Sequence, residues 1–258
     1  MYKGLDVSGM SVLVTGGTSG IGRAMALGFA QAGAKVCAGS TNPDKVAAIA
    51  KELGSGHHAV RLDVSDEASV KAAVEATRQK FGRIDAVINA AGVIAKKPSL
   101  EVTTEEFDRI VRINLTGSFI VAREAAKVMK DQSPGSRGQR GSITFIASLN
   151  SFISLSEVLA YASSKSGVLG LVRGLANEWA KIGIRVNAIA PGVFPTDLNR
   201  PLIEGTERGK WLTAHTPMNR FGDADELVGA AIYLSSPSAS YTTGETIIVD
   251  GGFLAKGV

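Results

Sequence analysis

A tyrosine and a lysine stand four residues apart in the sequence, as Tyr161 and Lys165. In a helix this spacing places both side chains on one face, so that they can share a site. A free tyrosine, with a pKa of about 10, is a poor proton carrier near neutral pH, but an adjacent ammonium group favours the phenolate and lowers that pKa. The pair therefore predicts proton transfer by Tyr161 with Lys165 as its partner, although such pairs also occur in ordinary helices.

A serine hydroxyl is expected beside this pair. Ser148 follows an apolar run, 143–147, that has the pattern of a buried strand. The carboxyl ends of parallel strands form the crevice in which α/β proteins bind ligands. The Ser148 hydroxyl is therefore suited to hold a substrate oxygen, and the three side chains together favour acid–base chemistry.

A glycine-rich turn, Thr15–Gly22, lies between an apolar strand and an amphipathic helix, 21–31. Glycine lets the backbone approach a pyrophosphate closely, and the free N–H groups at the start of the helix favour negative charge. Gly16, Gly20 and Gly22 have the spacing G-x-x-x-G-x-G, which differs from the G-x-G-x-x-G of the common dinucleotide fingerprint. On these glycines alone, a strand-to-helix turn without a ligand stays open as an alternative.

A parallel sheet is expected to position the glycine turn and the side chains of Ser148, Tyr161 and Lys165. Short apolar runs rich in valine and isoleucine alternate with longer stretches of helical periodicity, which is the pattern of βαβ units. We predict strands at Ser11–Thr15, Lys35–Ala38, Ala59–Leu62, Ala86–Asn89, Ser142–Ala147, Arg185–Ala190 and Thr246–Val249. Helical periodicity is clearest in Asp66–Phe81, Glu105–Lys130, Ala160–Lys181 and Ala224–Ser235. The predicted fold class is α/β, a single-domain Rossmann-type doubly wound parallel sheet of about seven strands with helices on both faces.

The chain of 258 residues is expected to form one domain, residues 1–258. Its cofactor half spans about 1–140, and its catalytic and substrate-loop half spans about 141–258. The Gly-, Ser- and Arg-rich stretch 133–141 is predicted to be a surface loop, since a strand pattern resumes directly after it. Hydrophobic residues make up 45% of the chain and charged residues 20%, which excludes disorder over most of its length.

Charge and cysteine content narrow the possible partners. Lys and Arg number 28 against 24 Asp and Glu, and the basic residues are scattered, so we expect no nucleic acid partner. Cys37 is the only cysteine, which excludes an intrachain disulfide and a cysteine zinc site and fits a cytoplasmic protein. His57, His58 and His215 show no ligand spacing, so we expect no metal. We expect no membrane partner, because no apolar run reaches membrane-spanning length and the first ten residues carry no signal core.

In chain order, these motifs resemble the short-chain dehydrogenase/reductase family. The resemblance runs across nearly the whole chain, through Thr15–Gly22, Asp63, Asn89-Ala90-Ala91-Gly92, Asn114, Ser148, Tyr161, Lys165 and Pro191-Gly192. It implies that Tyr161 is the general acid or base and that Ser148 orients the carbonyl. It also implies that Lys165 lowers the tyrosine pKa and binds the nicotinamide ribose, while Asn114 supports a water-linked proton relay. The implied reaction is hydride transfer between a nicotinamide cofactor and a carbonyl or alcohol.

The resemblance further implies the residues of the cofactor site. Asp63, at the end of the third strand, would contact the adenine, and Asn89 to Gly92 would line the floor. The family usually has two consecutive asparagines before Ala-Gly, whereas here Ala90 follows Asn89, which removes one side-chain hydrogen bond. The expected cofactor-binding residues are Gly16, Thr18, Ser19, Gly20, Ile21, Gly22, Ser40, Thr41, Asp63, Val64, Asn89, Ala90, Ala91, Gly92, Tyr161, Lys165, Pro191, Gly192, Val193 and Thr196.

The end of the second strand bears on the choice of cofactor. NAD preference usually calls for Asp or Glu at this point, and NADP preference calls for a basic neighbour. The segment 38–42 offers the hydroxyls of Ser40 and Thr41 and an amide, without an acid that would repel an extra phosphate. Lys45 is a distant counter-charge. We therefore favour NADP(H) over NAD(H).

In the family, the segment that corresponds to Val193–Pro217 closes over the substrate, so specificity is expected there. The candidate substrate residues are Asn150, Phe152, Glu157, Arg200 and Trp211. Arg200 is suited to a bidentate pair with a substrate carboxylate, and the alternative is an ordinary surface arginine. The stretches Ala176–Lys181 and Thr196–Arg200 are similar to the sugar-acid branch, which includes gluconate 5-dehydrogenases and 2-keto-3-deoxygluconate dehydrogenases.

Two other functions stay open at this point. A 3-oxoacyl thioester reductase of the same fold would carry a basic docking surface for an acidic carrier protein, and the small charge surplus does not decide this. A non-catalytic dinucleotide-binding regulator would have lost a catalytic side chain, whereas all four are present.

The resemblance also implies a homotetramer, with the long helices and Gly251–Leu254 as interfaces. The expected partner is a small carbonyl or alcohol molecule.

Overall fold

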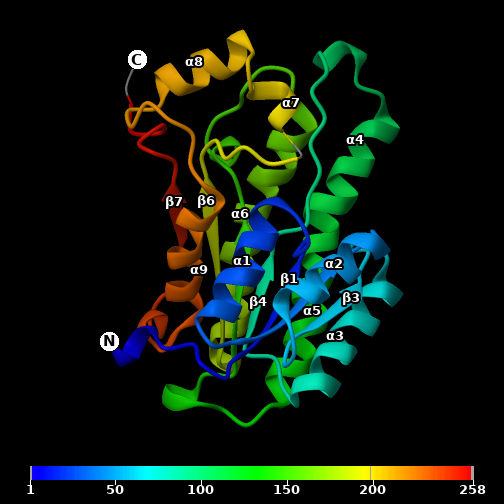
Figure 1. Ribbon diagram of the computed structural model, residues 1–258, viewed down its shortest axis with the longest axis vertical. Coiled ribbons are helices and arrows are strands. Elements are labelled where there is room, and N and C mark those ends of the chain that lie inside the picture. Colours follow the sequence, from blue (N-terminus) through cyan, green and yellow to red (C-terminus); the bar gives the residue numbers. More distant parts are fainter. Residues whose placement is uncertain (1, 198, 257–258) are drawn as a thin grey trace.

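A parallel sheet forms the centre of the computed structural model, which describes residues 2–197 and 199–256. Its strands are β1 (Ser11–Thr15), β2 (Lys35–Ser40), β3 (His58–Arg61), β4 (Ala86–Asn89), β5 (Gly141–Ile146), β6 (Ile184–Pro191) and β7 (Thr246–Val249). The strand order is β3-β2-β1-β4-β5-β6-β7, and each neighbouring pair is parallel (Figure 1). Every predicted strand is present, with ends that differ by at most two residues, and the predicted fold class is confirmed.

The direction in which strands are added reverses between β1 and β4. β1 pairs with β2 on one side and with β4 on the other, and later strands continue outward from each. In doubly wound sheets a ligand crevice opens at the carboxyl ends of the strands at such a reversal. Thr15 ends β1 and Asn89 ends β4, so the glycine turn and the 89–92 segment meet at this crevice.

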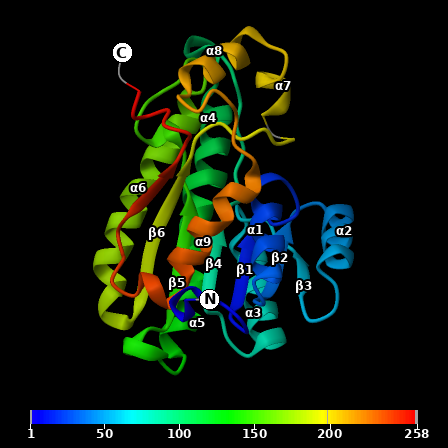
Figure 2. The same cartoon turned by 60° about the vertical axis from the view of Figure 1, so that its left-hand side comes forward.

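Helices cover both faces of the sheet (Figure 2). They are α1 (Gly20–Gln31), α2 (Pro43–Leu53), α3 (Glu67–Phe81), α4 (Thr104–Val111), α5 (Gly117–Asp131), α6 (Leu159–Trp179), α7 (Arg200–Ile203), α8 (Glu207–His215) and α9 (Val228–Ser235). Leu13 in β1 packs with apolar residues of α3, α5 and α6, whereas Val12 and Val14 pack with those of α1, α2 and α9. Because both faces are buried, the strand reads as a continuous apolar run.

The predicted helix Glu105–Lys130 is interrupted in the structure. α4 ends at Val111, a π turn spans Arg112–Thr116, and α5 begins at Gly117. The Gly117 N–H donates to the carbonyl of Arg112, one residue further back than in an α-helix. Apolar positions continue on both sides of the turn, so helical periodicity does not reveal the extra residue.

Helix α2 is one that apolar periodicity does not reveal. Asn42 caps it by accepting hydrogen bonds from two backbone N–H groups of the first turn, and Pro43 stands at its first position. Gly54, with a φ of 79°, follows its last residue. The buried side chains of the helix are Ile49 and Leu53, so its apolar stripe is short. The signals for this helix lie at its ends.

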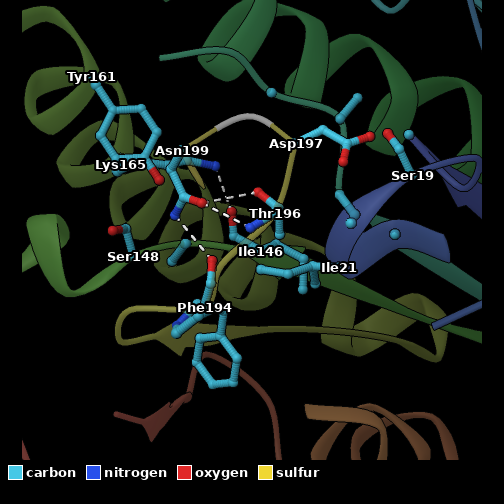
Figure 3. Close-up of a pocket in the computed structure, with 18 of the residues that line it drawn as sticks. Ser19, Ile21, Ile146, Ser148, Tyr161, Lys165, Phe194, Thr196, Asp197 and Asn199 are labelled. Atoms are coloured by element: carbon cyan, nitrogen blue, oxygen red, sulfur yellow. Dashed lines mark hydrogen bonds between the residues drawn. The ribbon is translucent and has the colours of Figure 1, made fainter. Parts of the chain in front are cut away.

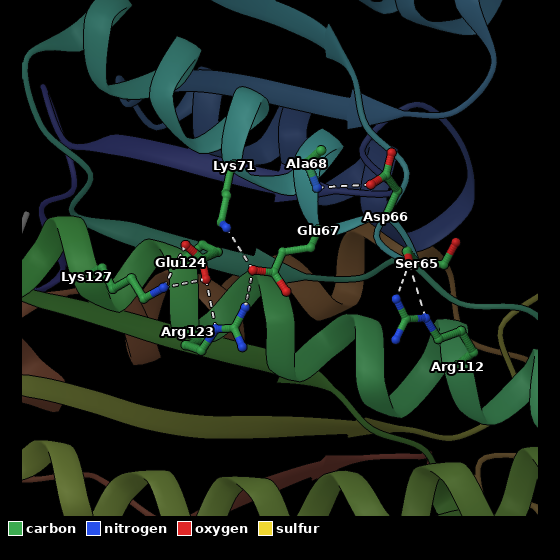
Figure 4. Close-up of polar contacts among 9 residues, drawn as sticks. All are labelled: Ser65, Asp66, Glu67, Ala68, Lys71, Arg112, Arg123, Glu124 and Lys127. Carbon is green, nitrogen blue, oxygen red and sulfur yellow. Dashed lines mark hydrogen bonds and ion pairs between the residues drawn. The ribbon is translucent and has the colours of Figure 1, made fainter.

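Ion pairs join α3 to α5 (Figure 4). The Glu67 carboxylate lies 2.8 Å from the Lys71 ammonium of its own helix and 2.9 Å from the Arg123 guanidinium of α5. Arg123 and Lys127 also pair with the buried Glu124. Hydrogen bonds from Lys71 and Arg123 lower the pKa of Glu67 to about 2. Since most of these groups are exposed to water, the network orients the two helices more than it stabilises them.

The π turn is tied to the loop that follows β3. Arg112 donates to the main-chain oxygen of Ser65 from Nε at 3.1 Å and from Nη2 at 2.5 Å. Ser65 in turn donates its N–H and its hydroxyl to the Asp63 carboxylate, at 2.9 and 2.6 Å. The turn that contains Asn114 is therefore connected to the loop that contains the predicted adenine contact.

The remaining segments lie away from the crevice or close over it. The predicted loop 133–141 contains a short 3-10 turn, Ser136–Gly138, and its last residue, Gly141, is the first residue of β5. α7 and α8 lie beyond the carboxyl ends of the strands (Figure 1). Leu198, part of the stretch 196–200 considered above, lies outside the described residues. Within the described ranges, no helix is both long and apolar enough to span a bilayer.

Candidate active site

Helix α6 brings Tyr161 and Lys165 to one cleft (Figure 3). Tyr161 lies in the first turn of the helix, and Lys165 follows one turn later. The Lys165 ammonium lies 5.7 Å from the centre of the Tyr161 ring. It also donates a hydrogen bond of 2.6 Å to the main-chain oxygen of Ile146, at the end of β5. The two groups therefore share a site, as their spacing predicts.

Ser148 lies beside Tyr161 in the same cleft (Figure 3). The residue follows β5 and is buried. Its Oγ accepts a hydrogen bond of 3.1 Å from the N–H of Asn150, in the short 3-10 turn Leu149–Ser151 that Ser148 caps, and this bond fixes the position of the hydroxyl. Because a hydroxyl that accepts a hydrogen bond still has its own proton to donate, Ser148 can donate to a substrate oxygen.

Asn114 is fully buried in the π turn and holds the segment that follows β4. Its Oδ1 accepts from the N–H of Val93 at 2.8 Å, and its Nδ2 donates to the carbonyl of Val93 at 2.9 Å. Nδ2 also donates to Ser164 Oγ at 3.1 Å, on the residue before Lys165. The side chain thus connects the floor of the cleft to α6. The proton-relay role of Asn114 stays a prediction.

Burial acts on both partners of the acid–base pair. It raises the pKa of Tyr161, and the Ser148 hydroxyl beside the phenol acts in the opposite direction. Burial lowers the pKa of Lys165 to about 8. Both shifts favour the uncharged forms. The lowering of the Tyr161 pKa that the sequence predicts therefore has to come from the Lys165 charge acting against burial.

The glycine turn fits a phosphate-bearing cofactor. Gly16 and Gly20 have φ angles of 65° and 50°, in the left-handed region that favours glycine. A Cβ at Gly16 would lie 3.0 Å from Cα of Ala91, and a Cβ at Gly22 would lie 2.2 Å from the main-chain oxygen of Gly16. Ser19 forms no side-chain cap within the described part of α1, so the first N–H groups of the helix are free for an anion. This cradle suits the pyrophosphate of a dinucleotide.

Thr15 organises the floor of the cleft. Its Oγ1 accepts hydrogen bonds of 3.1 Å from the N–H groups of both Ala90 and Ala91, and it donates to Asn89 Oδ1 at 3.2 Å. The Asn89 amide donates to the carbonyl of Ser118. Ala90, which departs from the family pattern, packs against the apolar cluster on the α1 side of the sheet. Sequence reasoning missed Thr15, although its position at the end of β1 was a usable signal.

The cleft between the glycine turn and α6 has a volume of about 220 Å³. The predicted residues that line it are Gly16, Ser19, Gly20, Ile21, Gly22, Ala90, Ala91, Gly92, Ser148, Tyr161, Lys165, Pro191, Gly192 and Thr196. The lining residues that sequence reasoning did not select are Ile146, Ala147, Phe194, Asp197 and Asn199. The glycine turn and the hydroxyls of Ser148 and Tyr161 therefore lie at one cleft.

Other predicted cofactor residues lie around this cleft rather than in its wall. Thr18 and Asn89 are buried beneath it, and Val193 lines an adjoining pocket. Ser40 and Thr41 stand at the carboxyl end of β2, and Asp63 and Val64 follow β3. These positions continue the crevice across the edge of the sheet, and their cofactor contacts stay predictions.

A second pocket adjoins the cleft, and Ser148, Tyr161, Gly192 and Asn199 line both. Its other lining residues are Ile94, Leu149, Asn150, Leu155, Val158, Val193, Leu202, Ile203, Arg208 and Leu212. The wall is mainly aliphatic, and the hydroxyls of Ser148 and Tyr161 stand where it meets the cleft. A molecule in the second pocket would therefore present its reacting group to Ser148 and Tyr161.

Of the predicted substrate residues, Asn150 lines the second pocket, and its side-chain oxygen accepts from the N–H of Leu155 at 3.0 Å. Among the described residues, the walls of the cleft and the second pocket do not include Phe152, Glu157, Arg200 or Trp211. Phe152 is 47% exposed. The structure thus brings one of the five predicted substrate residues to the pocket that Ser148 and Tyr161 line.

Ion pairs hold two of the other predicted substrate residues away from the pocket, and the phase of a helix turns a third one away. Glu157 pairs with Lys96 at 3.0 Å, and Arg200 pairs with Glu204 one turn later in the chain, at 2.7 Å. Trp211 is 53% exposed, and its ring stacks on His215 with centres 5.0 Å apart.

Helix α8 supplies other residues to the second pocket instead. Arg208 and Leu212, four residues apart, share the face that lines it. The helical patterns recognised in the sequence do not include one within 193–217, so the sequence does not give the phase of α8.

The segment after β6 folds over the cleft (Figure 3). Asn199 Oδ1 accepts from the N–H of Thr196 at 2.8 Å, and its Nδ2 donates to the carbonyl of Phe194 at 2.9 Å. A Cβ at Gly20 would lie 3.0 Å from the Thr196 methyl group, so this segment touches the glycine turn. The Asp197 carboxylate lies 3.6 Å from an ammonium group of α2, that of Lys45.

Other reactive groups lie outside the cleft. Cys37 is buried in β2, and burial raises the pKa of its thiol to about 11. Nδ1 of His57 accepts a hydrogen bond from the N–H of Val36, and partial burial lowers the pKa of this histidine. Within residues 2–197 and 199–256, no group of three or more His, Cys, Asp or Glu side chains is arranged to hold a metal ion.

Comparison with known proteins supports a single family. The family model described as Enoyl-(Acyl carrier protein) reductase matches residues 16–254. D-threitol dehydrogenase of Mycolicibacterium smegmatis is 37% identical over 253 residues, which cover 97% of this chain and 95% of that protein. The 2-dehydro-3-deoxy-D-gluconate 5-dehydrogenase of Formosa agariphila is 38% identical over 255 residues, covering 97% of this chain and 94% of that protein.

A solved structure agrees with these matches. The crystal structure of a gluconate 5-dehydrogenase from Burkholderia cenocepacia, in complex with NADP and tartrate, has a TM-score of 0.91 and 34% identity, and 99% of each chain is covered. Matches in sequence and in fold therefore extend over nearly the whole chain. The chain belongs to the short-chain dehydrogenase/reductase family, as an NAD(P)-dependent oxidoreductase that acts on alcohol or carbonyl groups.

Proposed function

We propose that this enzyme interconverts a secondary alcohol and a ketone on a sugar acid or a related polyhydroxy compound, with NADP(H) preferred over NAD(H). The observation that carries the proposal is that Ser148 and Tyr161 line both the cleft with the glycine turn and the adjoining pocket. The names of the relatives support the substrate class, since they act on threitol and on a deoxygluconate derivative.

Each catalytic side chain has one task in this proposal. The bound nicotinamide supplies or accepts the hydride. In the direction of reduction, the Tyr161 hydroxyl gives its proton to the carbonyl oxygen, and Ser148 donates a hydrogen bond to the same oxygen. The Lys165 charge stabilises the phenolate that results. In the direction of oxidation, the phenolate takes the alcohol proton, so hydride and proton leave the substrate together.

The preference for NADP(H) rests on charge at the end of β2. Ser40 and Thr41 stand there, and the described residues 38–42 include no carboxylate that would repel a ribose phosphate. Lys45, in the first turn of α2, places an ammonium group near the cleft, 3.6 Å from Asp197. A phosphate on the adenine ribose would gain from this charge.

We also propose a homotetramer in the cytoplasm, with outer faces of the long helices and the segment 251–254 as interfaces. Exposed apolar side chains near the C-terminal segment support an interface there, among them Met218 and Ile248. Light scattering on the purified protein tests the assembly, and a mass of one or two chains would contradict it. Fractionation of cells that produce the protein tests its location.

An absorbance assay tests the proposed reaction. NADPH and NADH oxidation, and reduction of their oxidised forms, are followed with sugar acids, polyols, simple ketones and a 3-oxoacyl thioester. We expect turnover with at least one polyhydroxy substrate and a higher kcat/KM for NADPH. Tyr161→Phe is the control, and its kcat is expected to fall about 10²-fold or more. Wild-type turnover by that variant would overturn the role of Tyr161, and a tenfold preference for NADH would overturn the cofactor assignment.

A 3-oxoacyl thioester reductase is the second candidate. The observation in its favour is the aliphatic wall of the second pocket, which includes Leu149, Leu202 and Leu212. An acyl chain would bury more apolar surface against this wall than a polyol would. A kcat/KM for the thioester at least tenfold above that for every polyhydroxy substrate would favour this candidate.

A further inference from the structure

The second pocket contains one charged side chain among its described lining residues, that of Arg208. The guanidinium belongs to the first turn of α8, and the same pocket contains Ser148 and Tyr161. The other lining residues are neutral, and most of them are aliphatic. A cation in such a wall attracts an anion more strongly than one on the open surface, because less water screens it.

Neighbouring basic residues are already paired with carboxylates. Arg200 pairs with Glu204 at 2.7 Å, and Lys210 pairs with Glu207 at 2.7 Å. Arg208 has no acidic partner within 4 Å among the described residues. Its Nη1 donates one hydrogen bond of 3.2 Å to the main-chain oxygen of Ser156. Since a guanidinium has five N–H donors, several of them are available to a ligand.

Close packing of α8 on α7 sets the position of Arg208. A Cβ at Gly209 would lie 1.8 Å from the main-chain oxygen of Ile203, so only glycine allows the two helices to approach this closely. Thr206 caps α8 by accepting a hydrogen bond of 3.0 Å from the Gly209 N–H. Leu212 lies one turn after Arg208 on the same face and is buried. The backbone at Arg208 is therefore held in place, and its side chain lines the pocket.

We propose that Arg208 binds the carboxylate of an acidic substrate and thereby gives the enzyme its preference for sugar acids over neutral polyols. This inference rests on the proposed function, because it takes polyhydroxy compounds as substrates. A carboxylate held by the planar fork of Arg208 leaves the hydroxyl-bearing carbons directed toward Ser148 and Tyr161. Arg200, which the sequence suggests for this task, is held by Glu204 outside the pocket wall.

Steady-state kinetics with D-gluconate and with threitol test the proposal. The variants are Arg208→Gln, Arg208→Lys and, as a matched control on α7, Arg200→Gln. For Arg208→Gln we expect KM for gluconate to rise about 10- to 100-fold, while its kcat and the KM for threitol change less than about threefold. Arg208→Lys should recover part of the gluconate affinity, since it keeps the charge without the fork. Arg200→Gln should leave both substrates unchanged.

A merely structural role would give a different pattern. If Arg208→Gln impairs gluconate and threitol equally, or leaves KM for gluconate within twofold of wild type, the proposal is wrong. Thermal unfolding and NADPH binding of the variant are measured alongside, and both should match wild type.

A binding measurement separates this inference from the proposed function. In the presence of NADP, D-gluconate and tartrate should raise the melting temperature of the wild type but not that of Arg208→Gln. A shift in the wild type that is lost in the variant, without turnover of any polyhydroxy substrate, would support Arg208 and overturn the proposed reaction. Absence of a shift in the wild type, or the same shift in both proteins, would overturn the role of Arg208.

Discussion

The Lys165 ammonium lies 5.7 Å from the centre of the Tyr161 ring and donates to the carbonyl of Ile146 at 2.6 Å. The lysine is therefore held by the backbone of β5 at a distance at which its charge acts on the phenol. Burial lowers its pKa to about 8. The Lys165 charge therefore lowers the stability of the folded state.

The first prediction concerns this loss of stability. Because the folded state lowers the Lys165 pKa from 10.5, the unfolded state binds more protons between about pH 8 and 10.5, and the penalty on folding is fully present below pH 8. We expect Lys165→Met to raise the free energy of unfolding at pH 7 by on the order of 1–3 kcal/mol, while turnover is lost. Urea unfolding measures this difference.

The pH dependence is the control for this prediction. As the pH rises from 8 to 10.5, the wild-type penalty disappears, so the difference between Lys165→Met and wild type should shrink. The same measurements on Tyr161→Phe report any general effect of changing the site. A difference that grows with pH, or a less stable variant at pH 7, would contradict the assigned cause.

The second prediction concerns Thr15. Thr15→Val removes the acceptor of two partly buried N–H groups, those of Ala90 and Ala91. We expect unfolding free energy to fall by about 1–3 kcal/mol and the Kd for NADPH to rise about tenfold. Thr15→Ser keeps the hydroxyl and should stay close to wild type in both measurements. Equal behaviour of the valine and serine variants would show that the hydroxyl does not hold the floor.

The third prediction concerns Lys45. Lys45→Ala should raise the KM for NADPH about 3- to 10-fold and leave the KM for NADH unchanged, because only NADPH carries the additional phosphate. The effect should weaken at high salt, where surface charges are screened. Lys51→Ala, in the last turn of the same helix, is the matched control and should have no effect on either cofactor. Equal changes in both KM values would argue against phosphate recognition.

The fourth prediction concerns Gly22. A Cβ there would lie 2.2 Å from the main-chain oxygen of Gly16, so Gly22→Ala must deform the turn. We expect NADPH binding to weaken by more than tenfold, measured by fluorescence titration. Gly229→Ala, in the short helix α9, adds a Cβ with no described atom within 4 Å and should stabilise the protein by about 0.5–1 kcal/mol. Retention of normal binding by Gly22→Ala would rule out the close backbone approach.

The strands and the site next to them were predictable because their signals are local. Buried strands read as valine- and isoleucine-rich runs, and of the predicted catalytic residues Ser148 follows a strand and Tyr161 and Lys165 lie near a helix start. Tyr161 and Lys165 share a face because of a spacing that the sequence displays. Ser148 reaches the cleft because the carboxyl ends of parallel strands meet at one edge.

The substrate pocket was less predictable for a physical reason. Its wall depends on the phase of a short helix, α8, and a one-residue error in phase exchanges Leu212 for Trp211. Arg200 and Arg208 have the same chemistry in the sequence, and only their partners distinguish them. Glu204 neutralises the first, whereas the second faces the pocket. The burial that raises the Tyr161 pKa is likewise a property of packing.

The π turn at Arg112–Thr116 makes the number of residues in this helix as important as their identity. Deleting one residue would convert the turn to α geometry and rotate one side of the helix relative to the other by about 100°. If the deleted residue lies between Asn114 and Ser118, either Asn114 would lose Val93 or the Ser118 carbonyl would lose the Asn89 amide, because the rotation separates these two contacts. A change in length that leaves every named side chain in the sequence would therefore still dismantle the site.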